Sequence, residues 1–257
     1  MKLTVTVITY NEAAHIAAAL ESVAWADEII VVDSGSTDGT AEIARAKATR
    51  VIVREWRGYS AQKNFAADQA ANEWVLSMDA DERVTPALAA EIRALMVKGP
   101  EARGYRIKRV SRYLGHWIRT TDWFPDYQLR LYDRRAGRWN GLRIHESFRL
   151  EDTTPGTLRK ETPGTLREEL EHYAYRDVTH HVQKINHYTT LIVDQWVEEG
   201  RQTSLAQVVV HPLGAFLRNY IARGGIRQGA AGLIVSALNS YYVFLKFAKL
   251  WERQRRG

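Results

Sequence analysis

Apolar and polar positions alternate along the first half of the chain in blocks that predict strands and helices in turn. Short runs rich in aliphatic and β-branched residues predict four strands, at residues 3–10, 28–32, 50–54 and 74–78. Apolar residues spaced three and four apart predict helices between them, over residues 11–23 with Asn11 as the N-cap, 41–48 and 62–71. This alternation predicts an α/β fold with a mostly parallel, doubly wound sheet.

The second half of the chain changes character and predicts a mainly helical region. A helix over residues 86–97 and a strand over 104–110 lead into aromatic, basic loops and short strands that extend to residue 148. Three further helices are expected at residues 178–199, 212–222 and 230–253. We therefore expect one domain over residues 1–150 and a helical C-terminal extension over residues 151–257.

A tandem octad occupies residues 154–169, where Thr-Pro-Gly-Thr-Leu-Arg-Lys-Glu is followed by Thr-Pro-Gly-Thr-Leu-Arg-Glu-Glu. Two copies are too few for a solenoid, which needs about three repeats or more. A local duplication that extends a surface loop is the simpler interpretation.

Composition narrows the class of protein. The 257 residues contain no cysteine, which excludes a disulfide framework, a thiolate metal site and a cysteine nucleophile. The net charge of +6 is uneven, because residues 103–149 carry +8 and residues 203–257 carry +7. Two basic regions in a chain whose remaining residues are net acidic suggest two sites that bind anions.

The last predicted helix is not expected to span a membrane, because Ser236, Asn239 and Ser240 interrupt its apolar part and Lys246 and Lys249 follow. Two alternatives remain open for it. A basic, aromatic-rich helix could lie on an anionic membrane surface, or it could dock on the domain with a solvated basic end.

Polar loops follow three of the predicted strands and carry the candidate chemistry. Asp79-Ala80-Asp81-Glu82 comes directly after the fourth strand, Thr9–Glu12 after the first and Asp33–Asp38 after the second. Parallel strands bring such loops to one edge of the sheet, where ligands bind in open α/β folds. The rim suits a ribose, a base edge and a metal-bound diphosphate. The chain contains neither a dinucleotide-binding Gly motif nor a phosphate-binding P-loop.

These motifs, in this order and spacing, resemble the inverting family 2 glycosyltransferases of the GT-A fold. The resemblance covers residues 1 to about 110 and rests on Val7–Glu12, Ile30–Thr40, Gln62–Asn64 and Met78–Glu82. Phe124–Tyr132, Trp139–Gly141, Ile144–Glu146 and His172-Tyr173 resemble a bacterial branch that contains the lipopolysaccharide-core β-glucosyltransferases. The fold expected from the resemblance is a Rossmann-like, mostly parallel sheet flanked by helices.

The resemblance implies a UDP-sugar donor and a Mg²⁺ or Mn²⁺ cofactor. It implies that Asp81 is the direct metal ligand, that Asp79 contacts the ribose or the metal, and that His145 completes the metal site or touches the diphosphate. Oxygen ligands and phosphates suit these cations. The remaining nucleotide contacts that it implies are Thr9, Tyr10, Asn11, Glu12, Asp33 and Lys63.

An inverting transfer also needs a general base for the acceptor hydroxyl. The resemblance places Glu146 in that role, with Asp126 as the second candidate, in analogy to the base carboxylate of inverting glycosidases. Asp126, Gln128 and Arg130 are expected on the acceptor side, and Trp123, also on that side, could stack on a sugar ring. The surrounding basic charge suits an acceptor that carries phosphate or carboxylate groups.

The chain is thus expected to be a hexosyltransferase that acts on a bacterial surface glycan or a lipid-linked acceptor, in the cytoplasm or peripherally on the inner face of the membrane. Nucleic acid is not an expected partner, because the acidic rim would repel its backbone. Three other classes remain as alternatives: a nucleotidyltransferase, a basic nucleic-acid-binding protein, and a catalytically inactive membrane-surface scaffold.

Overall fold

The structure is a computed structural model that describes residues 1–141, 146–151 and 162–256. The chain forms two compact units. The first comprises Met1–Arg109 and Tyr127–His172, and the second comprises Val110–Asp126 and Tyr173–Gly257. The domain boundary expected at residue 150 stays a prediction.

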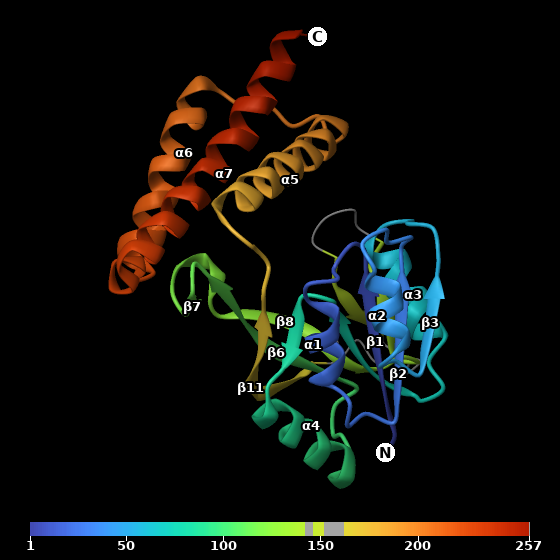
Figure 1. The fold of residues 1–257 in the computed structure, drawn as a ribbon. Coiled ribbons are helices and arrows are strands. Elements are labelled where there is room, and N and C mark those ends of the chain that lie inside the picture. The colour runs from blue at the N-terminus through green and yellow to red at the C-terminus, as the bar shows by residue number, and fades with distance from the viewer. Residues whose placement is uncertain (142–145, 152–161, 257) are drawn as a thin grey trace, which may run out of the picture. The chain divides into compact units, whose positions relative to one another are not determined.

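The first unit is built on four parallel strands in the order β3-β2-β1-β4 (Figure 1). They are β1 (Leu3–Thr9), β2 (Glu28–Asp33), β3 (Arg50–Val53) and β4 (Trp74–Asp79). Every residue of β1 is buried, which explains why its sequence is apolar or Thr throughout. The predicted parallel α/β core is therefore confirmed.

The sheet continues beyond β4 with strands of mixed direction, in the order β4-β8-β6-β11-β5. Strand β8 runs antiparallel to β4, and β11 runs antiparallel to β5. A separate two-stranded sheet pairs β10 with β9. The bounds are β5 (Glu82–Val84), β6 (Gly104–Tyr113), β8 (Asp126–Asp133), β9 (Gly137–Trp139), β10 (Phe148–Leu150) and β11 (Gly164–His172).

Helices cover both faces of this sheet. Leu3, Val5 and Val7 of β1 pack in one apolar cluster with α1 (Ile16–Glu21), α2 (Thr40–Arg45) and α4 (Pro86–Lys98). Ile8 points to the opposite face, where it joins α3 (Tyr59–Asp68) through Ala66. The alternation along β1 thus supplies apolar contacts to both layers.

The prediction that Asn11 caps the first helix is wrong. Helix α1 begins at Ile16 with His15 as its N-cap and without a side-chain cap. Asn11 has a φ of 54°, in the left-handed region that Asn tolerates better than most residues, and its side chain binds the loop after β2. The local sequence signal for a helix cap is misleading here, because the Asn11 side chain instead accepts a hydrogen bond from the Thr37 backbone N–H.

The second octad copy forms part of the central sheet, so the surface-loop interpretation is wrong for that copy. Residues Gly164–Glu169 belong to β11, and Leu166 is buried in the core of the first unit. Residues 152–161, which include the whole first copy, lie outside the described residues.

The second unit is mainly helical, as predicted. Helix α5 (Val178–Glu198) and helix α6 (Leu205–Leu217) both pack against α7 (Gly229–Arg256). The remaining elements are β7 (His116–Ile118), which pairs with the end of β6, and the short turns η1 (Thr121–Trp123), η2 (Arg218–Ala222) and η3 (Gly225–Gln228).

Helix α6 begins earlier than predicted, because Pro212 lies inside it and does not start it. Ser204 accepts a hydrogen bond from the Gln207 backbone N–H, and the Gln207 side chain in turn accepts one from the Ser204 N–H. This reciprocal cap fixes the helix start at Leu205, seven residues before the proline.

One helical stretch among the described residues, Gly225–Arg256, is long and apolar enough by length and composition to cross a membrane. Core helices of globular units meet the same criteria. Two of the polar interruptions noted in its sequence, Asn239 and Ser240, form hydrogen bonds to other helical segments of the same unit, whereas Ser236 donates to the Gly232 carbonyl of α7 itself.

Candidate active site

The register of the parallel strands brings three polar loops to one edge of the sheet. Thr9 at the end of β1 lies opposite Asp33 at the end of β2, and Ile8 lies opposite Asp79 at the end of β4. The convergence expected of these loops is therefore confirmed. Their roles toward a ligand stay predictions.

The loops after β1 and β2 are tied together by side-chain hydrogen bonds. Asn11 Oδ1 accepts from the Thr37 backbone N–H at 2.9 Å, while the Asn11 N–H donates to Ser36 Oγ at 2.8 Å. The Glu12 N–H donates to Thr40 Oγ1 at 2.8 Å, and the Ala13 N–H donates to Asp38 at 3.0 Å. The two loops form one hydrogen-bonded rim.

The buried carboxylate of Asp33 shapes its own loop. Oδ1 accepts from the backbone N–H groups of Gly35 and Ser36 at 3.0 and 2.9 Å, and Oδ2 accepts from the Ser36 hydroxyl. Thr9 Oγ1 is buried with no hydrogen-bond partner among the described residues, whereas Tyr10 is exposed. Thr9 thus offers an unused polar atom at the rim.

Lys63 of α3 links two candidate residues that are far apart in the sequence. Its side chain is only 1% exposed, and Nζ lies 2.9 Å from Glu146 Oε1 and 3.1 Å from Asp79 Oδ1. The ammonium also lies over the ring of Trp139 at 4.6 Å. Asn64 exchanges hydrogen bonds with the Trp139 backbone, so α3 holds this ring in place. The predicted base candidate and the acidic cluster therefore share one cation.

A second buried cation completes the charge network around Asp79. Arg130 of β8 lies 2.6 Å from Asp79 Oδ2 and 2.7 Å from Glu82 Oε1, and Arg109 lies 3.0 Å from the same Glu82 oxygen. Glu82 is fully buried and accepts the Asp79 backbone N–H. Glu82 is therefore a central member of the cluster.

These cations control the ionisation of Asp79. Burial alone would raise the pKa of Asp79, but the charges of Arg130, Lys63 and Arg109 lower this pKa far below its usual range. Burial likewise opposes the charge of Arg130, yet Asp79 and Glu82 raise its pKa above the ordinary value. Lys63, Arg109 and Arg130 balance the charges of Asp79, Glu82 and Glu146.

Asp81 points to a different partner. Its Oδ2 lies 3.5 Å from His172 Nε2, at the pairing of β5 with β11. No group of three or more His, Asp or Glu that could hold a metal ion occurs within the part of the chain that the structure describes. His145, the other predicted metal-site residue, lies outside that part. A carboxylate beside an imidazole nonetheless is a donor pair that suits Mn²⁺.

Three of the predicted acceptor residues, Asp126, Gln128 and Arg130, occupy alternate positions of β8 and so share one side of that strand. Arg130 is buried and committed to Asp79 and Glu82, and Gln128 lies on the same strand. Trp123 and Asp126 belong to the second unit. The acceptor roles of all four residues stay predictions.

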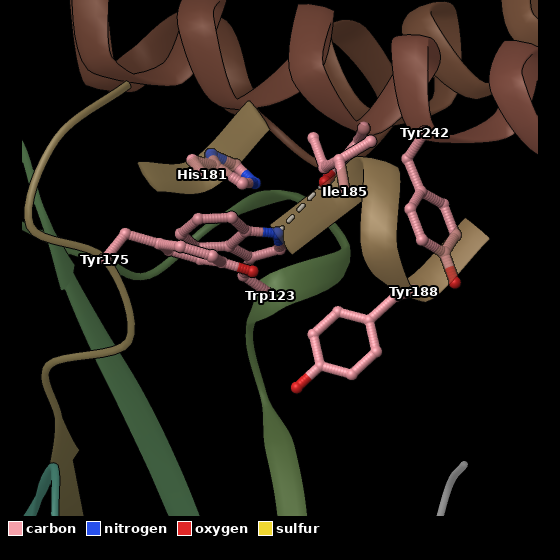
Figure 2. A pocket seen from close by; sticks show the side chains of 7 residues that line it. Trp123, Tyr175, His181, Ile185, Tyr188 and Tyr242 are labelled. Atoms are coloured by element: carbon pink, nitrogen blue, oxygen red, sulfur yellow. Dashed lines mark hydrogen bonds between the residues drawn. The ribbon is translucent and has the colours of Figure 1, made fainter. Parts of the chain in front are cut away.

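Trp123 lines an aromatic cavity of about 190 Å³ within the second unit (Figure 2). Trp123 stacks on Tyr175, which stacks on His181, and the Trp123 indole N–H donates to Asn239 Oδ1 at 3.0 Å. Figure 2 shows Tyr188 and Tyr242 across from this stack. A ring-lined cavity of this kind suits a sugar or another flat, partly apolar group.

The sequence did not predict that Arg109, Arg130 and His172 would lie beside the acidic cluster. Arg109 and Arg130 belong to a basic stretch of the sequence, and His172 belongs to a short motif far from the acidic loop. Their places depend on which strands lie side by side, since β8 joins β4 and β11 joins β5.

Comparison with known proteins identifies the family. The model of "Glycosyl transferase family 2" matches residues 4–150. The lipopolysaccharide core biosynthesis glycosyltransferase LpsC of Rhizobium meliloti (strain 1021) is 32% identical, over 98% of this chain and 93% of that protein. An uncharacterized glycosyltransferase of Rickettsia typhi is 31% identical, over 98% of this chain and 87% of that protein.

A solved structure supports the fold across the whole chain. A mannosyltransferase from Pyrobaculum calidifontis, solved with GDP-Man and Mn²⁺, matches with a TM-score of 0.54 and 16% identity, over 98% of this chain and 88% of that one. With the parallel core and the polar edge described above, these matches lead to one conclusion. The chain belongs to glycosyl transferase family 2 and has the GT-A fold.

Proposed function

We propose that this glycosyltransferase moves a hexose from a UDP-sugar to a hydroxyl of a bacterial surface glycan or lipid-linked acceptor, with inversion at the anomeric carbon. Similarity to the Rhizobium meliloti core-biosynthesis enzyme favours the lipopolysaccharide core as the acceptor. The observation that carries the proposal is the convergence of Lys63, Asp79 and Glu146 at one strand edge. These residues come from three separate motifs of the sequence.

Glu146 is the proposed general base. Its side chain is 21% exposed, so an acceptor hydroxyl can reach it, and Lys63 holds the carboxylate at 2.9 Å. The acceptor O–H proton passes to Glu146 while the acceptor oxygen bonds to the anomeric carbon. The bond from that carbon to the diphosphate breaks on the opposite side, and UDP leaves.

The remaining edge residues are proposed to bind the donor. The joined loops after β1 and β2 would receive the uridine, with Thr9 Oγ1 supplying an unused hydrogen-bonding atom. Asp79 would face the ribose, since Lys63 and Arg130 already neutralise its charge. Lys63 would also offset the diphosphate charge.

A Mg²⁺ or Mn²⁺ ion fits the donor set beside Asp79. Asp81 would supply the carboxylate oxygen and His172 the imidazole nitrogen, with His145 as a further predicted ligand. When bound, the cation stabilises negative charge on the departing nucleoside diphosphate. The Pyrobaculum calidifontis neighbour was solved with Mn²⁺.

The experiment is a panel of UDP-sugars assayed for hydrolysis and transfer with Mn²⁺, with Mg²⁺ and with EDTA. Glu146→Gln should lower turnover by about 10²–10⁴-fold, because positioned proton transfer contributes that much, while donor binding measured by calorimetry changes little. Asp81→Asn should weaken Mn²⁺ binding, measured by electron paramagnetic resonance.

Two controls separate the assignments. Asp126→Asn should keep most activity; if it loses turnover while Glu146→Gln keeps it, the base is Asp126. The absence of hydrolysis and binding for every UDP-sugar tested would refute the donor assignment.

A further inference from the structure

Helix α6 carries an apolar stripe that stays more than half exposed among the residues that the structure describes. Its exposed members lie at Leu205, Val209, Val210, Leu213 and Leu217, each between 54% and 63% exposed. Ile221 of η2 and Ile226 of η3 follow with 62% and 58% exposure. Large exposed apolar patches on soluble proteins often mark a surface where something binds.

The stripe is distinct from the face that builds the core. Val208, Pro212 and Ala215 are buried on the side of α6 that packs against α7. Leu205, Val209, Leu213 and Leu217 recur every fourth position, and at about 100° per residue they span an arc of about 120° on the other side. Helix α6 is therefore apolar on two faces, and within the described part of the chain one of them packs against α7 while the other stays exposed.

Charge around the stripe points to the chemistry of the missing partner. Residues 200–251 contain no Asp or Glu, but six Lys or Arg. Arg218 and Arg223 share one carboxylate, Asp122, and each side chain stays more than half exposed. Arg227 is exposed as well. Basic side chains thus flank the C-terminal end of an exposed apolar helix.

We propose that α6, η2 and η3 dock in the plane of an anionic lipid bilayer, with the stripe buried in the headgroup region. An amphipathic helix with basic flanks binds in this way, through buried apolar area and attraction to acidic lipids. The proposal is independent of the donor chemistry at the β4 edge.

Helix α7 does not span the bilayer in this arrangement, because its polar groups serve its own unit. Asn239 binds Trp123 and Asn219, and Ser240 donates to the Pro212 carbonyl. Lys249 donates to the Asn186 carbonyl at 2.8 Å. These contacts make α7 the central helix of the second unit.

The absence of cysteine permits a direct test. Leu213→Cys and Leu217→Cys, labelled with nitrobenzoxadiazole, should gain fluorescence and shift to the blue on vesicles of phosphatidylglycerol and phosphatidylcholine. Val97→Cys is the matched control, since Val97 is an 88% exposed apolar residue on α4. Equal shifts at all three positions, or none at 213 and 217, would overturn the proposal.

Sedimentation with vesicles measures the same docking in unlabelled chain. Leu213→Asp/Leu217→Asp should lower the partition coefficient at least about tenfold, whereas Val97→Asp should not. Arg218→Gln/Arg223→Gln/Arg227→Gln should weaken binding to acidic vesicles and reduce its salt dependence. Circular dichroism and lipid-free donor hydrolysis should be unchanged in all of these variants.

Two outcomes would assign the surface or the helix differently. A dimer in light scattering that the double Asp variant abolishes, without vesicle binding by the parent, would make the stripe an interface between copies. Vesicle binding that resists carbonate extraction would indicate that α7 spans the bilayer.

Discussion

Lys63 holds a positive charge at a position where solvent reaches almost none of the side chain. Such burial costs free energy unless charged partners offset it. Asp79 and Glu146 are those partners, at 3.1 and 2.9 Å, and the Trp139 ring covers the ammonium. The residue is therefore a structural requirement of the site as well as a proposed nucleotide contact.

Lys63→Met should destabilise the fold by about 1.5–3 kcal/mol, since it leaves the partly buried Glu146 without this cation and Asp79 with Arg130 alone. Urea denaturation monitored by circular dichroism gives the free energy of unfolding. Lys47→Met is the control, because the Lys47–Glu21 pair lies on the surface and should contribute less than about 1 kcal/mol. If the free energy of unfolding fell equally in the two variants, the stabilising role of the buried Lys63 ion pairs would be contradicted.

His181 makes the second unit sensitive to acid. Burial, with smaller effects from Lys184 and His180, lowers the pKa of His181 to about 4. Between its ordinary value of 6.5 and about 4, the unfolded chain binds a proton that the folded chain does not. Its neutral, stacked state therefore contributes stability that is complete above pH 6.5 and is lost as the pH falls through this window.

Replacing His181 should flatten that dependence. In His181→Phe, which keeps a ring beside Tyr175, the free energy of unfolding should fall less between pH 7 and pH 5 than in the parent. The comparison uses the change in the free energy of unfolding between pH 7 and pH 5, so a destabilisation by the substitution that is the same at both pH values cancels. An unchanged difference would show that other groups set the acid sensitivity.

At the scale of elements, the sequence predicted those strands and helices whose own residues carry a clear apolar pattern. Strands β1 to β4 each carry a short apolar run with its own turn signal, and all four were found. Strands β5 and β11 escaped prediction because their pairing joins Glu82–Val84 to residues more than eighty positions later. In β11 only Leu166 and Leu170 are buried, and they lie four positions apart, so the strand has no regular alternation of apolar residues.

The same distinction between local pattern and long-range pairing applies to the residues of the candidate site. Asp79 and Lys63 lie in motifs with local signals, so they were predicted. The positions of Arg130 and His172 depend on antiparallel strands that join the sheet late in the chain. Local patterns contain no information about which strand becomes the neighbour of another.

The close approach of β11 to the core gives a test at this scale. A Cβ at Gly164 would lie 2.5 Å from the Tyr105 ring, so Gly164→Ala should destabilise the fold by about 1–3 kcal/mol through overpacking. Gly214→Ala in α6 meets no atom within 4 Å and should stabilise it by about 0.5–1 kcal/mol. Thermal denaturation of both variants measures the contrast.

For the whole molecule, the two units carry separate tasks under the proposals made here. The first holds the polar edge and the second holds the apolar stripe of α6. Separate surfaces should be separable by mutation, because residues without shared partners contribute independently.

Leu213→Asp/Leu217→Asp should therefore hydrolyse a UDP-sugar in lipid-free solution at the parent rate. The same variant should lose at least about tenfold in transfer to a lipid acceptor embedded in acidic vesicles, since it no longer concentrates on the membrane. Glu146→Gln should fail in both assays. A double Asp variant that keeps full transfer would separate acceptor use from membrane docking.

The hydrogen bonds between Asn11 and the Ser36-Thr37 pair have a consequence for redesign of donor preference. The two loops depend on each other, because replacing one loop alone removes the protein acceptor of the backbone N–H group at residue 11 or 37. Under the proposed uridine contact, redesign of the accepted base should exchange both segments together, because a library that varies one loop at a time loses the hydrogen bonds that join them.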